Sequence, residues 1–159
     1  MQGDAKVIDY LNAQLKNELS AVNQYFLHAR MYDHWRLGGL GKHEYDESIS
    51  EMKHADALIK RIFVLEGLPN LQDLDKLLIG EDAQEILECD LKLEQTSQVT
   101  CKEAIAYCES VKDYVSREIM EQLLDATEEQ IDWLETQLEL IKKIGIENYL
   151  QSGMTSLDE

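Results

Sequence analysis

The sequence has little that would interrupt helices, since its 159 residues include one proline and eight glycines. It has no CxxC pair, and its three cysteines are an odd number, which argues against a disulfide framework. No apolar run approaches the roughly 20 residues that a membrane-spanning helix needs. These absences predict an all-helical protein without a membrane span. We expect free thiols at Cys89, Cys101 and Cys108.

The chain also lacks a Lys/Arg stripe and carries a net charge of -17, which disfavours a nucleic-acid partner. The acidic surplus has two interpretations, solubility or a carboxylate-lined surface that collects cations. The first eleven residues have no basic start followed by an apolar stretch, so no secretory signal is indicated. We therefore expect a cytoplasmic protein with no membrane partner.

A chain that is 44% apolar and 30% charged is not a disordered one, and 159 residues suffice for a single domain with its own core. Periodicity and capping residues predict one domain over residues 1–159. We expect four long helices, from Asp4 to about Trp35, Gly41 to Glu66, Asp82 to about Cys108, and Asp113 to Gly145.

The connections predict the topology. A glycine-rich turn at residues 37–41 joins the first two helices, and Gly67 followed by Pro69 ends the second, with the glycine in a left-handed conformation. Residues 69–81 are long enough to run the length of a bundle and to place the third helix parallel to the second. The result is a four-helix bundle over about residues 4–145. A short fifth helix follows at about 146–152, and the end from Gly153 to Glu159 is expected to fray.

Polar residues interrupt the apolar stripes of these helices. Glu18 lies on the inward stripe of the first helix and Glu94 on that of the third. A buried carboxylate needs a partner or a metal, although a glutamate at the edge of a stripe can also extend to solvent. On the second helix Glu51 and His54 are three residues apart, so they share a face and can bind one metal ion.

The second helix has an additional apolar row, rotated from the first. Since one bundle core covers only one side of a helix, this row predicts an interface between subunits, to which the first helix contributes a matching row. The two rows are Tyr45, Ile49, Met52, Ala55, Ile59 and Phe63, and Leu19, Asn23, Phe26 and Arg30.

Di-iron bundles take one Glu from each of two helices and a Glu-x-x-His from each of the other two. Three helices here comply, but the fourth has Thr127 and Gln130 where Glu and His are expected. Glu128 and Glu129 follow Thr127 but are rotated by about 100° and 200° from it on a helix.

Five segments, in order and with ungapped spacing, make the sequence resemble bacterioferritin, the haem-containing branch of the ferritins, over essentially its whole length. They are Gln24 to Met31 (QYFLHARM), Glu51 to Asp56 (EMKHAD), Leu65 to Leu71 (LEGLPNL), Asp113 to Arg117 (DYVSR) and Ile131 to Glu135 (IDWLE).

The resemblance implies a ferritin-like bundle that assembles into a hollow shell of 24 subunits, with the fifth helix at the four-fold axes and a ferric mineral stored inside. It also implies haem b at the two-fold interfaces, shared between two subunits and bound by a methionine from each. Met52 matches that methionine. The alternative is that Met52 only packs in an interface. A ferredoxin-type electron donor is a further partner that the family suggests.

Residue by residue, Glu18, Glu51, His54 and Glu94 match the family's ferroxidase ligands, whereas Thr127 and Gln130 replace a bridging Glu and a second His. This predicts weak or absent oxidation of Fe(II) by paired irons. Some family members build shells from two subunit types, and this chain resembles the type that binds haem but has a degraded centre. Two alternatives stay open: an active ferroxidase that recruits Glu128 or Glu129, and a haem-binding subunit without iron chemistry of its own.

Overall fold

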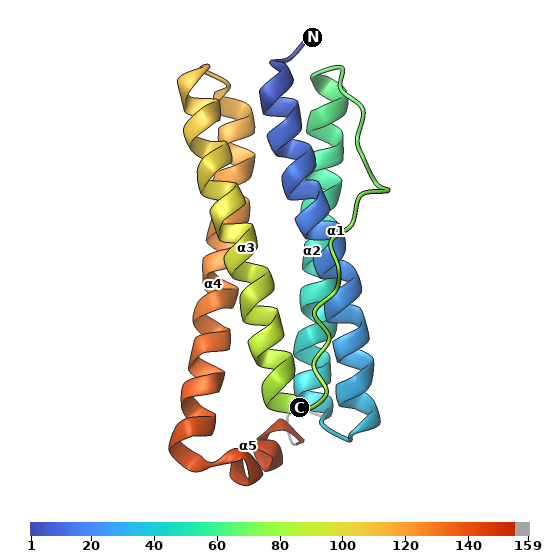
Figure 1. Cartoon of the computed structure of the whole chain (residues 1–159), viewed down its shortest axis with the longest axis vertical. Helices are drawn as coiled ribbons and strands as arrows, with labels where there is room; N and C mark the ends of the chain where they lie inside the picture. The colour runs from blue at the N-terminus through green and yellow to red at the C-terminus, as the bar shows by residue number, and fades with distance from the viewer. Residues whose placement is uncertain (155–159) are drawn as a thin grey trace.

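The computed structural model describes residues 1–154, which form five helices and no strand (Figure 1). The predicted all-helical fold is confirmed. The bounds are α1 (Ala5–His34), α2 (Gly38–Val64), α3 (Ala83–Ser110), α4 (Tyr114–Ile144) and α5 (Ile146–Gly153). Gly153 still belongs to α5, so fraying does not begin there, and the rest of that prediction falls mainly on residues 155–159, outside the described residues. No helix within residues 1–154 has the length and apolar character needed to cross a bilayer.

The predicted N-terminal caps are present. Asp4 accepts from the backbone N–H groups of Lys6 and Val7, and Asp113 accepts from that of Ser116. Asp82 caps α3 by accepting from the N–H of Glu85, while the Glu85 carboxylate accepts from the N–H of Glu81. These bonds satisfy N–H groups that the first turn of a helix leaves unpaired.

The first turn of the bundle lies earlier than predicted. Gly38, Gly39 and Gly41 are the start of α2, and the chain reverses at residues 35–37, where Arg36 has φ 64°. Gly41 is needed for close packing rather than for a turn, because a Cβ there would overlap the Asp33 carboxylate and come within 3.1 Å of the Ala29 carbonyl oxygen.

The end of α2 also differs from the prediction. The left-handed residue is Glu66, with φ 63°, and not Gly67. The N–H of Gly67 donates to the carbonyl of Ile62 at 2.9 Å, which closes the helix end. Position 67 leaves little room for a side chain, because a Cβ there would lie 2.9 Å from Ile8 Cγ2.

Helices α1 and α2 form one antiparallel pair and α3 and α4 the other, with α5 across the end of the bundle where α3 begins (Figure 1). The long segment between α2 and α3 runs back along α1, so α3 is parallel to α2 as predicted (Figure 1).

A row of polar residues on α1, spaced by four, fastens this crossover segment to the bundle. Positions four apart lie on one face of a helix, so the row follows the segment along the whole of α1. Asn12 binds residues 68 and 70, and Lys16 and Ser20 both bind Asp75. Further along, Gln24 binds Leu78, His28 binds Gly80, and Tyr32 binds Ala83 at the start of α3.

Removing one member should loosen the crossover. Gln24 is fully buried, accepts from the N–H of Leu78 at 3.0 Å and donates to Asp90 at 3.0 Å. We expect Gln24→Ala to lower the free energy of unfolding by about 1–3 kcal/mol, since it leaves buried polar groups without their partner. Denaturant unfolding measures this. The control Gln95→Ala, at an exposed position of α3, should change it by less than about 0.5 kcal/mol.

Two apolar clusters fill the ends of the bundle, and a layer of buried polar residues separates them. One cluster contains Leu11, Leu58 and Met120, and the other contains Tyr32, Leu87 and Leu134. The layer between them is where chemistry can occur, because buried charges need partners, protons or metal ions. Its members include Glu18, Tyr25, His28, Glu44, Glu51, Asp90, Glu94, Thr127 and Gln130.

Candidate metal centre

Three of the predicted ligands meet in the polar layer. Glu18 comes from α1, and Glu51 and His54 come from successive turns of α2; one ligand atom of each lies within 4.8 Å of the others. Glu18 is 2% exposed and Glu51 5% exposed. His54 Nδ1 lies 3.3 Å from Glu51 Oε2 and 3.6 Å from Glu18 Oε2. Two carboxylates and one imidazole form a mixed O/N set that suits Fe(II) or Zn(II).

The electrostatics of this group also favour a cation. Burial by itself lowers the pKa of His54, but the carboxylates of Glu18 and Glu47 together outweigh burial, and the net direction is upward. A divalent ion would take the place of the proton that the carboxylates attract to this imidazole.

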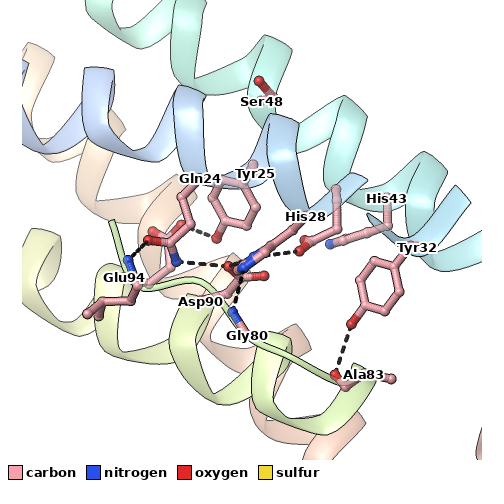
Figure 2. A network of polar contacts seen from close by, with 12 residues as sticks. Gln24, Tyr25, His28, Tyr32, His43, Ser48, Gly80, Ala83, Asp90 and Glu94 are labelled. Atoms are coloured by element: carbon pink, nitrogen blue, oxygen red, sulfur yellow. Dashed lines mark hydrogen bonds and ion pairs between the residues drawn. The ribbon is translucent and has the colours of Figure 1, made fainter. Parts of the chain in front are cut away.

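The fourth predicted ligand, Glu94 on α3, faces the same layer and is 2% exposed. Tyr25 donates a hydrogen bond of 2.5 Å to Glu94 Oε2 (Figure 2). Burial raises the pKa of Glu94 well above its usual value, although the bond from Tyr25 acts in the opposite direction. In the absence of a metal ion, Glu94 therefore holds a proton more strongly than an exposed carboxyl does.

Glu94 belongs to a second group, whose third member the sequence analysis did not select as a ligand. One ligand atom each of Glu47, Glu51 and Glu94 lies within 4.8 Å of the others, and Glu51 is common to both groups. Burial raises the pKa of Glu47 to about 7. The four-residue spacing of Glu47 and Glu51 was the available signal, since it places both on one face of α2.

Thr127 and Gln130 of α4 point into the layer, as their positions in the di-iron pattern of the sequence predict. Thr127 is 5% exposed and Gln130 is 4% exposed. The Gln130 amide bridges two groups, with Nε2 donating to the Tyr25 hydroxyl at 3.3 Å and Oε1 3.1 Å from His43 Nε2. A neutral amide therefore stands opposite Glu94, where a ligand to a second metal ion would be needed.

His43 is a second residue that the sequence analysis overlooked. Its ring stacks on Trp133, with centroids 3.5 Å apart, and burial lowers its pKa, which favours the neutral imidazole. Both rings line a pocket of about 560 Å³ that also reaches His54, Glu47 and Gln130. This pocket gives solvent ions a route to the two acidic groups.

The two glutamates next to Thr127 are exposed and do not point into the layer. Glu128 accepts a hydrogen bond from Gln98 of α3 at 2.8 Å. Glu129 lies at the rim of the pocket that reaches His54. Both carboxylates therefore lie outside the buried layer.

The row on α2 that predicts a subunit interface is mostly uncovered in the single chain. Met52 is 52% exposed and Phe63 60% exposed, and Phe26 of α1 is 47% exposed. The Arg30 guanidinium packs over Phe26 and Tyr45, 5.0 and 5.2 Å from the ring centroids. One assignment was wrong: Ala55 is 3% exposed and belongs to the core. An exposed thioether on an apolar face fits a haem axial ligand at a subunit contact.

A model of the ferritin-like domain family matches residues 8–144. A bacterioferritin from Brucella melitensis biotype 1 is 48% identical over 159 residues, which is all of this chain and 99% of the relative. This chain belongs to the bacterioferritin family. A bacterioferritin from Rhodobacter capsulatus is 46% identical over 99% of this chain and 98% of its own length, and a bacterial ferritin from Pseudomonas aeruginosa is 48% identical over 96% and 99%.

Family membership confirms the resemblance inferred from the sequence and the ferritin-like fold. In this chain the acidic residues of α1, α2 and α3 converge, and the inward face of α4 presents a hydroxyl and an amide. The buried layer is therefore acidic where α1, α2 and α3 meet and neutral along α4.

Proposed function

We propose that this chain stores iron as a subunit of a hollow bacterioferritin shell of 24 subunits, with an incomplete di-iron centre. Its iron-binding groups take Fe(II) as substrate at one firm position and one weak position. The firm position consists of Glu18, Glu51 and His54, and the weak one of Glu47, Glu51 and Glu94.

The observation that carries this proposal is the asymmetry of the buried layer. On the side of α1 and α2, two carboxylates and the imidazole of His54 converge. On the side of α4, the neutral amide of Gln130 is held between Tyr25 and His43. Two adjacent divalent ions repel each other and require negative charge between and around them. With neutral side chains on α4, oxidation of Fe(II) by an iron pair is expected to be slow.

The same proposal assigns haem b to the Met52 face, with one methionine from each of two subunits as axial ligands. The exposure of Met52 beside exposed aromatic residues supports it. Bound haem would pass electrons toward the stored mineral and promote iron release. A ferredoxin-type protein is the proposed electron donor, and the cytoplasm the proposed location.

A chain with a weak second position works best beside subunits with a complete one. We therefore propose mixed shells, in which this subunit contributes haem and a ferroxidase-competent bacterioferritin subunit contributes rapid oxidation. Native mass spectrometry of shells from the source organism should then show two subunit masses. A shell of one mass, with rapid Fe(II) oxidation, contradicts this part of the proposal.

Metal titration tests the two positions separately. We expect the pure homopolymer to bind one Co(II) per chain tightly, followed by a second at least about 100-fold more weakly. Binding at the weak position displaces protons from Glu47 and Glu94, whose pKa values are raised. The affinity for the second ion should therefore increase from pH 6 to pH 8, by up to about tenfold per pH unit for each proton displaced.

Visible absorption of Co(II) and calorimetry measure both steps. Glu47→Gln should remove the second step and keep the first, because Glu47 belongs only to the weak group. Glu129→Gln, at the rim of the same pocket, is the matched control and should keep both. Equal affinities for two ions in the unmodified chain would show that the centre is complete.

A further inference from the structure

A second cluster of ionisable side chains lies in the buried layer, outside the proposed metal centre. It contains His28 of α1, Glu44 of α2 and Asp90 of α3, and none of them is more than 1% exposed. His28 Nδ1 lies 2.9 Å from Asp90 Oδ1 (Figure 2). It also lies 3.7 Å from Glu44 Oε1. Two carboxylates are thus enclosed with one imidazole.

The backbone of the crossover segment determines the protonation of that imidazole. The N–H of Gly80 donates to His28 Nε2 at 3.1 Å, so Nε2 has a free lone pair and carries no proton. The ring proton is therefore on Nδ1, from which it is donated to Asp90 Oδ1. His28 is neutral in this arrangement and does not compensate the charge of either carboxylate.

Three carboxylate oxygens of the cluster have no hydrogen-bond donor among the described residues, namely both oxygens of Glu44 and Oδ2 of Asp90. The hydroxyl groups around Glu44 are directed elsewhere. Tyr25 donates to Glu94, Tyr32 to the carbonyl of Ala83, and Tyr149 to Gln137. One ligand atom each of His28, Glu44 and Asp90 lies within 4.8 Å of the others. Two charged carboxylates this close, with three of their oxygens lacking a donor or a cation, would strongly destabilise the folded state.

We propose that Glu44 and Asp90 share a single proton, so that Glu44 is a neutral carboxylic acid that donates to Asp90 Oδ2 at neutral pH. One proton then satisfies an orphan oxygen on each residue and halves the negative charge. A divalent cation is the other way to neutralise the pair. It fits less well, because the Gly80 N–H fixes the proton on the His28 nitrogen that faces the cluster.

This acid pair supports the attachment of the crossover segment. Asp90 Oδ1 accepts from Gln24 and from His28, which orients both side chains. Each of them in turn accepts a backbone N–H of the crossover, Gln24 from Leu78 and His28 from Gly80. Loss of the shared proton would place two charges side by side and loosen these contacts.

The groups that face Glu44 are carboxylates or uncharged side chains. Carboxylates face it from α2 (Glu47) and α3 (Asp90 and Glu94), and uncharged groups face it from α1 (Tyr25, His28 and Tyr32) and α5 (Tyr149). Burial first, and then Asp90, raise the pKa of Glu44 well above its usual value. Because the folded state holds the proton more tightly than the unfolded chain, Glu44 contributes most stability at low pH. That contribution falls as the pH rises from about 4.5 toward the folded pKa.

One amide substitution tests the shared proton in the assembled protein. Glu44→Gln keeps only the acid of Asp90, so this variant cannot share a proton between two carboxylates. Hydrogen exchange of residues 76–82, read by mass spectrometry, reports the attachment of the crossover. At pH 6 we expect the native chain and Glu44→Gln to be protected alike, and at pH 9 the native chain to exchange at least about tenfold faster than Glu44→Gln at the same pH.

Comparison at equal pH removes the intrinsic pH dependence of exchange. Asp46→Asn, an exposed change on the same helix, should behave like the native chain. Infrared difference spectra should show a protonated carboxyl band in the native chain that Glu44→Gln lacks. The proposal is wrong if Glu44→Gln keeps the native response to pH. It is also wrong if the native protein contains a chelator-removable metal ion that Glu44→Gln loses while Glu47→Gln retains it.

Discussion

Replacing Thr127 with Glu and Gln130 with His in the same chain should tighten the second Co(II) site of the homopolymer by at least about 100-fold, a gain of roughly 3 kcal/mol or more. Both positions are buried, and Gln130 donates to the Tyr25 hydroxyl, which in turn donates to Glu94. The new carboxylate places negative charge next to both ions, and the imidazole adds a nitrogen ligand to a group that has only oxygens.

Stopped-flow oxidation of Fe(II) is the second measurement on this variant. We expect a rapid phase that consumes two Fe(II) per chain, whereas the unmodified homopolymer lacks it. The matched control is Thr127→Gln with Gln130→Leu, which fills similar volumes without charge or imidazole and should leave both measurements unchanged. A rapid two-iron phase in the unmodified homopolymer would contradict the incomplete centre.

Met52→Leu should reduce the haem content of the shell to less than about a tenth, and Met52→His should keep haem but shift its absorption bands, because the axial ligand changes from sulfur to nitrogen. Met52 is 52% exposed and has no role in the core of the bundle. The free energy of unfolding of the single chain should therefore change little, by within about 0.5 kcal/mol.

The haem content and spectrum of protein made with an ample haem supply measure this effect. Met154→Leu is the matched control. Met154 is 48% exposed and lies near the C-terminus, away from the Met52 face, so this substitution should leave the haem spectrum unchanged. Native haem bands in Met52→Leu would show that another residue binds the iron. The side chain of Met52 would then be only a packing residue of the subunit contact.

Local patterns in the sequence were sufficient for the helices and for part of the centre. Caps such as Asp4 and Asp113 act within three residues, so their signals are local. Glu51 and His54 also needed only the helical period. The turns were less well predicted. The glycines were predicted to form turns, but Gly41 instead permits close packing of α2 on α1. The left-handed backbone conformations at these two turns belong to Arg36 and Glu66.

Contacts between residues of different helices could not be predicted from the sequence. Glu47 and His43 become parts of the centre only because α2 packs where α3 and α4 bring Glu94 and Gln130 toward them. The same applies to Glu44, whose unpaired oxygens are visible only once Asp90 lies beside it. Side chains that are polar on a mostly buried face have many explanations until the opposing helix is known.

The sequence by itself determined the all-helical bundle and the family, because helix formation depends on residues a few positions apart and the family motifs are short segments. It also predicted Glu18, Glu51, His54 and Glu94 as iron ligands, through the resemblance to that family. The tertiary structure alone decided that Glu47 lies beside Glu51 and Glu94, that Gln130 is held between Tyr25 and His43, and how the polar row on α1 holds the crossover segment. Those features depend on distances between residues as far as 105 positions apart, and no local periodicity encodes them.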